Sequence, residues 1–243
     1  MLGVVAAAIA PAVPQPLDYH LFSDRRSAFG IPNFADVASN AGFLIAGVAG
    51  LAVLFGGRAR FEDPRERWPW AVFFAGLVLI AFGSAYYHLA PDNERLFWDR
   101  LAITFAFAGL IASQLADRIG VRAGLLSLAP MLAVGAASVL RWRATERAGE
   151  GNVIPYFAVQ GSAILLLLWI VLAFPSRYSR GRDLAWILAW YALAKLCEAF
   201  DDRFFQLGHL VSGHTLKHVA AAIAGFVACL MLSRRTLIAS TAA

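Results

Sequence analysis

Apolar stretches long enough to cross a lipid bilayer recur along most of this chain, and they constrain its fold more than any other feature. A transmembrane helix needs about 20 mainly apolar residues. Stretches of this kind, separated by short polar segments, cover residues 34–54, 70–88, 97–115, 120–140, 153–174, 184–205 and 213–232. The sequence therefore predicts an all-α polytopic membrane protein. We expect a bundle of seven transmembrane helices, with residues 1–243 as one domain and residues 1–33 as an N-terminal segment outside the bundle.

The composition agrees with a membrane location and argues against nucleic acid as a partner. Hydrophobic residues make up 60% of the 243 residues and charged residues 15%, well below the roughly 25% charged residues of soluble domains. The formal net charge of +5 reflects nineteen arginines and only two lysines. The arginines lie between the apolar stretches rather than in one basic stripe, which is typical of contact with lipid headgroups. Cys197 and Cys229 fall inside apolar stretches, so we expect buried free thiols without a redox role.

The distribution of arginine between the loops predicts the orientation in the membrane. Loops on the cytoplasmic side collect arginine and lysine. The loops after the first, third and fifth stretches, together with the C-terminus, contain eleven arginines, whereas the opposite side contains eight. We therefore expect an extracytoplasmic N-terminus and a cytoplasmic C-terminus. Residues 1–16 are apolar, contain prolines and lack a basic start, so we expect a surface-lying terminus rather than a signal peptide.

Two polar groups at the ends of apolar stretches carry the candidate chemistry. Near the end of the second stretch, Ser84 and His88 share one helix face, because four residues correspond to about one helical turn. Asp99 follows a turn and can return to the same depth in the membrane. His214 and His218 have the same spacing at the start of the last stretch. Three histidines without a cysteine are typical of an open zinc site with water as the fourth ligand.

Several of these polar residues also have simpler interpretations. A serine in a membrane helix often eases helix packing, and Asp99 could cap the third helix, which is compatible with facing a metal-bound water. Single histidines at a membrane edge usually bond to headgroups, and we expect this for His20 and His209. Lys195 and Glu198 lie three residues apart in the sixth stretch, and we expect an ion pair beside the site rather than direct participation.

The order and spacing of the candidate residues resemble those of a known family. Ser84 and His88, then W-D eleven residues after the histidine, then H-x-x-x-H at positions 214–218 in the last of seven helices, are similar to the alkaline ceramidases. That family belongs to a superfamily of seven-helix membrane hydrolases that includes the adiponectin receptors. The resemblance covers residues 18–233. It implies a zinc-dependent amidase for ceramide-like lipids, with His88, His214 and His218 as zinc ligands and Ser84 and Asp99 completing the site.

The residues before the first stretch also enter the resemblance. The segment from Asn33 to Asn40, which includes Asp36, is similar to the family's entry into its first helix. Eukaryotic members bind calcium just before that helix through an acidic segment. Here Asp18 and Asp24 remain, but the segment has fewer acidic groups, and Asn33 stands where a carboxylate is expected. Asp18, Asp24, Asn33 and Asp36 are therefore candidate supporting residues or calcium ligands, and calcium is a weaker prediction than zinc.

The resulting hypothesis is an integral-membrane amidohydrolase that cleaves the N-acyl amide of a membrane lipid to a fatty acid and a sphingoid or other amine. Zinc would lower the pKa of its bound water to about 7. Asp99 would transfer the proton as base and then acid, and Ser84 would orient the water or donate to the oxyanion. Two alternatives stay open: a seven-helix receptor or transporter with a structural zinc site, and a haem-binding electron carrier. The residues do not distinguish ceramide from other acyl amides or esters, and they leave the oligomeric state open.

Overall fold

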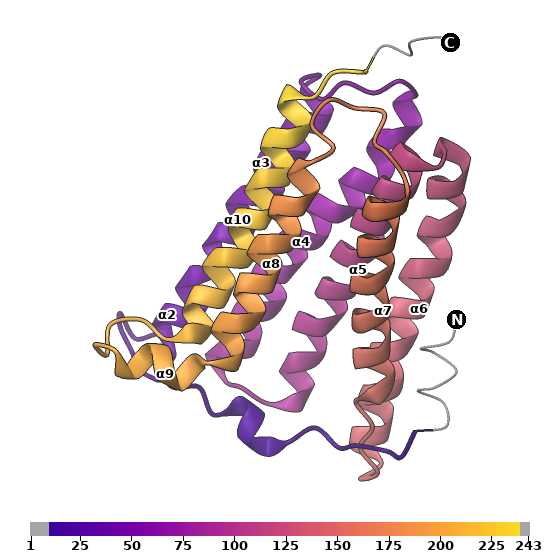
Figure 1. Ribbon diagram of the computed structural model, residues 1–243. Helices are drawn as coiled ribbons and strands as arrows, with labels where there is room; N and C mark the ends of the chain where they lie inside the picture. Colours follow the sequence, from indigo (N-terminus) through magenta and orange to yellow (C-terminus); the bar gives the residue numbers. More distant parts are fainter. Residues whose placement is uncertain (1–9, 239–243) are drawn as a thin grey trace.

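The computed structural model describes residues 10–238, and its regular structure is helical apart from two isolated β-bridges, Ala28 to Ile31 and Tyr178 to Leu237. Residues 1–9, which form most of the expected surface-lying terminus, lie outside the described residues. The long helices run side by side along one axis (Figure 1). The elements in order are η1 (Leu17–His20), α2 (Phe34–Ser39), α3 (Ala41–Phe55), η2 (Pro64–Glu66), α4 (Arg67–Leu89), α5 (Asn93–Arg118), α6 (Val121–Arg147), α7 (Ile154–Ala173), α8 (Asp183–Ala199), α9 (Asp201–Gln206) and α10 (Gly213–Arg234).

Six of the described helical segments are long and apolar enough to cross a membrane, so the chain has the architecture of a multi-pass membrane protein. They are Phe34–Phe55, Pro64–Leu89, Asn93–Arg118, Val121–Arg147, Ile154–Ala173 and Gly213–Arg234. Helix α8, which contains most of the predicted sixth span, is not among them and has 17 residues. The structure thus supports the all-α membrane fold through six candidate spans.

The predicted continuous helix over residues 184–205 was wrong, because the chain turns at Phe200. This residue has φ −111° and ψ 31°, outside the helical region, and the short α9 follows it. The Asp201 carboxylate accepts hydrogen bonds from the backbone N–H of Ser23, at 3.0 Å, and from that of His214, at 2.7 Å. Asp201 therefore connects the break to the N-terminal segment and to the first turn of α10.

Polar caps decide where the two helices beside the candidate site begin. The Asp92 side chain accepts a hydrogen bond from Arg95 N at 2.7 Å and caps α5, which therefore begins at Asn93, earlier than the sequence suggested. Asp99 consequently lies in the second turn of α5 and does not cap it. The Ser212 side chain caps α10 by accepting from Thr215 N at 3.1 Å.

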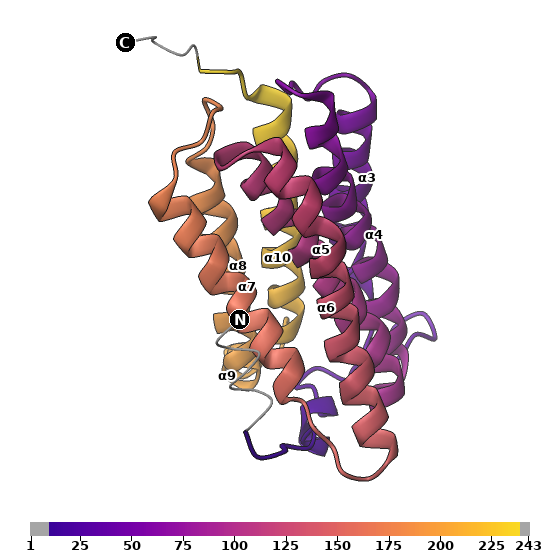
Figure 2. The same cartoon turned by 90° about the vertical axis from the view of Figure 1, so that its right-hand side faces the viewer.

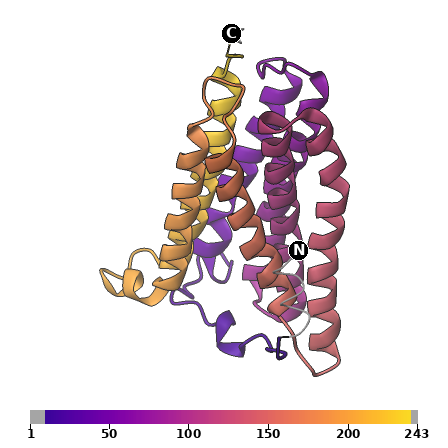
Figure 3. The same ribbon diagram turned by 45° about the vertical axis from the view of Figure 1, so that its right-hand side comes forward.

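The long helices surround an internal cavity. Helix α4 packs against α3 and α5, α7 packs against α5 and α6, and α10 packs against both α3 and α8. Helix α10 therefore connects α8 to the α3–α4 side of the bundle; in Figure 3, α8 and α10 lie on the left and α6 on the right. In the view turned by 90°, α7 and α8 lie on one side of the bundle and α3 and α4 on the other, with α10 between them (Figure 2).

The N-terminal segment over residues 10–33 runs across one end of the bundle (Figure 1). Gln15 N donates to the Glu146 carboxylate of α6 at 2.8 Å. The His20 ring lies within hydrogen-bonding distance of the Tyr87 hydroxyl of α4, at 2.8 Å. The segment therefore connects helices that are far apart in the sequence. The last described residues lie at the opposite end of the bundle.

Candidate metal centre

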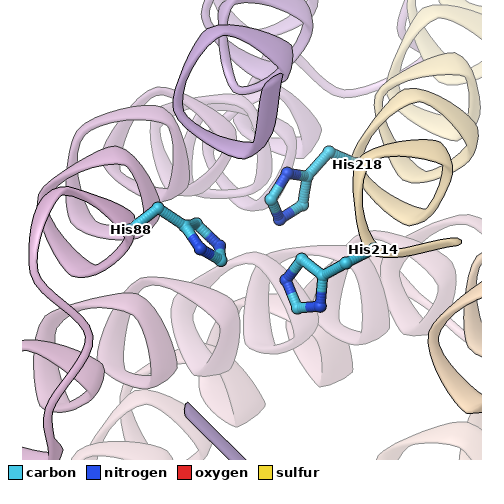
Figure 4. Close-up of side chains that lie close together, drawn as sticks. All are labelled: His88, His214 and His218. Carbon is cyan, nitrogen blue, oxygen red and sulfur yellow. The ribbon is translucent and has the colours of Figure 1, made fainter. Parts of the chain in front are cut away.

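Three histidines from two helices lie together at the end of the bundle that the N-terminal segment covers. His88 is in the last turn of α4, and His214 and His218 are in the first two turns of α10. Their imidazoles point toward one another (Figure 4), with ring centroids 4.8–5.0 Å apart. All three are buried, and one potential ligand atom from each lies within 4.8 Å of the other two. Among residues 10–238, this is the only such group of three or more His, Cys, Asp or Glu side chains.

A close contact between backbones places α10 where its histidines can reach this point. The first residue of α10 is Gly213, and a Cβ atom there would lie 2.2 Å from the carbonyl oxygen of Cys197 in α8. Only glycine permits this approach. On the other side, the Asn33 side chain donates to the backbone carbonyl of His88 at 2.8 Å and connects the start of α2 to the end of α4.

Ser39 determines which nitrogen of His218 is available to a metal. The Ser39 hydroxyl donates to the backbone carbonyl of Asp36 at 3.0 Å and lies 2.8 Å from His218 Nδ1. Since a hydroxyl has one proton, the consistent assignment has Nδ1–H donating to Ser39 Oγ. The lone pair then lies on Nε2, on the opposite side of the ring. Orientation of a ligating imidazole by a partner on its other nitrogen is usual at metal sites.

The residues of this group fit a metal ion. His88 Nδ1 and His214 Nε2 are buried and have no hydrogen-bond partner within residues 10–238, and unsatisfied buried nitrogen atoms are costly. Zn–N bonds of about 2.0–2.1 Å place the nitrogens of a tetrahedral site roughly 3.4 Å apart, so small ring movements would close this group around an ion. Imidazole donors suit zinc, copper, iron and nickel. The geometry therefore defines a candidate metal centre without specifying the ion.

Ser84 and Asp99 lie side by side on the wall of the cavity next to the histidines. Helices α4 and α5 approach closely here, since a Cβ atom at Gly83 would lie 2.7 Å from the Trp98 carbonyl oxygen. Ser84 and Asp99 are both buried, their side chains are neighbours, and both line the cavity together with His218. A hydroxyl and a carboxylate thus line the same cavity as one of the three histidines.

The expected ion pair between Lys195 and Glu198 is present, with a partner that sequence reasoning missed. The Glu198 carboxylate binds Lys195 Nζ through one oxygen and Lys217 Nζ, at 2.9 Å, through the other. Lys217 is in α10, between His214 and His218. Glu198 therefore joins α8 to the helix that carries two of the three histidines.

The four candidate supporting or calcium residues near the N-terminus lie in different environments. Asp18 is exposed. Asp24 is buried against the Arg26 guanidinium at 2.7 Å, and this hydrogen-bonded pair holds the pKa of the Asp24 carboxyl below its usual value. Asn33 bonds to His88 as described, and the buried Asp36 accepts a hydrogen bond from the Thr215 hydroxyl at 2.6 Å. Asn33 and Asp36 therefore support the histidine helices, while Asp24 is already neutralised by arginine.

Phe22 is another contributor that the sequence alone did not reveal. Its buried ring packs against His88 and His214, with centroid distances of 4.6 and 4.4 Å. The ring belongs to the N-terminal segment and covers the histidine group from the end of the bundle. The sequence around Phe22 does not indicate this contact, because His88 and His214 are far from Phe22 in the chain.

The cavity beside the histidines is mostly apolar and has a volume of about 160 Å³. Its wall on α4 runs from Phe73 through Leu77 and Ile80 to Ser84, a helical distance of about 16 Å. The polar residues of the wall gather toward the histidine end, and aromatic and aliphatic side chains line the remainder. The cavity is therefore apolar along most of its length and polar at the end near the histidines.

The fold and the site together define an all-helical, multi-pass membrane protein with a buried three-histidine group that could hold a metal ion. Comparison with known proteins adds no family assignment, since no family model matches the chain and no curated protein matches it.

Proposed function

We propose that this protein is a zinc-dependent integral-membrane amidohydrolase that cleaves the N-acyl amide of a ceramide-like lipid. The observation that carries the proposal is the three-histidine group at the polar end of an apolar cavity, with Ser84 and Asp99 on the adjacent wall. Structural zinc usually has four protein ligands. A three-ligand group next to a carboxylate and an apolar cavity favours catalysis.

His88, His214 and His218 would hold the zinc, which supplies Lewis acidity and lowers the pKa of a coordinated water. Asp99 accepts the proton of the attacking water and returns it to the nitrogen of the departing amine. Ser84 donates a hydrogen bond to the oxygen that develops negative charge. The acyl chain lies along the wall formed by Phe73, Leu77 and Ile80, and Phe22 limits access of bulk water to the histidines.

The proposal includes seven membrane passes, with α8 as the additional one. In Figure 1, α8 lies beside α10 along much of the bundle, from the loop before Asp183 toward the histidine end. The first and last described residues lie at opposite ends of the bundle, as an odd number of passes requires. The eleven arginines at the end away from the histidines favour a cytoplasmic location for that end. The reaction centre then faces the extracytoplasmic side.

Hydrolysis of a defined lipid by the purified protein tests this proposal. Ceramide and an N-acylethanolamine are incubated with the full chain, and release of free fatty acid is measured. Asp99→Asn keeps the shape of the side chain but removes the base, so turnover should fall by roughly 10²–10⁴-fold, while metal content stays at the wild-type level. Asp202→Asn, which changes an exposed carboxylate of α9, is the matched control and should retain activity. Equal turnover in the wild type and Asp99→Asn would contradict the assignment.

A further inference from the structure

Arg100 is a buried cation without an anionic partner. Its side chain is in α5, 2% exposed, and lines the cavity next to Asp99. Its Nη2 donates to the neutral Gln15 side chain at 2.5 Å, whereas Nη1 is buried and has no partner within residues 10–238. None of the ion pairs between described residues includes Arg100, and residues 1–9 contain no acidic side chain. A buried charge of this kind is costly unless something pairs with it.

Aromatic rings hold the Arg100 guanidinium in place. Its central carbon lies 4.2 Å from the ring centroid of Trp142 and 4.7 Å from that of Tyr156, with Tyr19 at 5.6 Å and Phe157 at 5.8 Å. These cation–π contacts stabilise and orient the cation. They do not satisfy the N–H donors of Nη1, for which the oxygens of a carboxylate or a phosphate are the best-matched partners.

The other charges in the cavity wall leave Arg100 unneutralised. The wall carries three cationic side chains (Arg100, Lys195 and Lys217) and two anionic ones (Asp99 and Glu198), so its formal charge is 3 − 2 = +1. Glu198 pairs with both lysines, so one positive charge is left over in that group, where the Lys195 side chain is 48% exposed and can be solvated. Asp99 lies beside Ser84 and does not form an ion pair with Arg100. Arg100 is therefore the buried cation of the wall that has no ion-pair partner, and it lies at the polar end of an otherwise apolar cavity.

We infer that Arg100 binds an anionic group, a carboxylate or a phosphate, on the headgroup of the lipid that occupies this cavity. The ligand is an acidic N-acyl amphiphile, with its chain along the apolar wall and its acidic group at Arg100. Naming this lipid as a substrate depends on the proposed hydrolase function. The binding of an acidic amphiphile at Arg100 does not depend on it.

Two matched assays on the full-length protein test this inference. The first compares hydrolysis of N-palmitoylglycine with that of N-palmitoylethanolamine, which have the same acyl chain but end in a carboxylate and an alcohol. The second measures binding of hexadecyl phosphate, palmitate and hexadecanol, which contain no amide and distinguish a phosphate from a carboxylate. Arg100→Gln removes the charge, Arg100→Lys retains it, and Arg203→Gln, which alters an exposed arginine of α9, is the control.

The wild type and Arg203→Gln should favour the acidic member of each set by at least about tenfold, chiefly in KM or Kd, as expected for a charge-assisted hydrogen bond. Arg100→Gln should abolish this preference, and Arg100→Lys should keep part of it. Equal affinity of the wild type for the anions and the alcohol would overturn the inference, even if Arg100→Gln does not fold. If the acidic amphiphiles bind in an Arg100-dependent way but no amide is hydrolysed, the proposed hydrolase function is refuted and the anion site stands. If hydrolysis occurs but does not depend on the acidic group or on Arg100, the anion site is refuted and the hydrolase function stands.

Discussion

Ser39→Ala offers a selective test of how the metal centre is built, because Ser39 orients a ligand without being one. The Ser39 hydroxyl lies 2.8 Å from His218 Nδ1 and directs the Nε2 lone pair toward the other histidines. Loss of such an orienting partner typically lowers metal affinity 10–100-fold. The Asp36 carbonyl remains close to the same ring and can still accept the Nδ1 proton. We therefore expect the lower part of this range, roughly 10–30-fold, or about 1.4–2 kcal/mol.

Competition with a chelator of known affinity measures this change on purified, monodisperse protein. Ser127→Ala is the matched control, since Ser127 makes the same type of hydrogen bond to the carbonyl three residues earlier, that of Gly124, at 2.9 Å. It lies in α6, away from the histidines. Unchanged affinity in Ser39→Ala, or an equal loss in Ser127→Ala, would refute the role assigned to the serine–imidazole hydrogen bond.

Two further predictions concern the packing of α10 and the N-terminal segment. Gly213→Ala places a methyl group 2.2 Å from the Cys197 carbonyl oxygen and should destabilise the protein by about 1–3 kcal/mol. Gly161→Ala is the control, since no atom lies within 4 Å of the added methyl group, and it should not destabilise the protein in this way. Equal unfolding temperatures of the two variants would contradict the packing argument. Burial lowers the pKa of His20 in the folded protein, so folding favours the neutral imidazole. The contribution of His20 to stability is therefore present above the unfolded-state pKa of about 6.5, and it is lost as the pH falls from there toward the folded-state pKa. Metal-free His20→Gln should therefore lose less thermal stability between pH 7 and pH 5 than metal-free wild type, and identical pH profiles would show that His20 does not contribute.

The helices and the histidine group could be predicted because they depend on local spacing and on depth in the membrane. An apolar run of about 20 residues specifies a membrane helix almost regardless of its neighbours. The i, i+4 spacing places His214 and His218 on one face, and His88 lies at the matching end of its own helix. These patterns were sufficient to predict that the three imidazoles lie close together, which the structure confirms.

The remaining features depend on contacts between residues that are distant in the sequence. Ser39 and His218 are 179 positions apart, and nothing local to either residue indicates that they meet. The helix break at Phe200 is associated with hydrogen bonds that Asp201 accepts from two other segments, so helix propensity alone could not locate it. Arg100 falls inside the predicted third stretch, and its aromatic neighbours come from three separate parts of the chain, so no local pattern indicates that they surround it.

Elemental analysis of the zinc content of the purified protein after mild chelation tests directly whether the three histidines hold the metal. Wild type and His209→Ala, which removes an exposed histidine outside the group, should each retain about one zinc per chain. His88→Ala, His214→Ala and His218→Ala should each lose most of it, because the affinity depends on the complete ligand set. Full zinc retention in all three variants, or its absence from the wild type grown with zinc, would contradict the central claim that these histidines form a zinc centre.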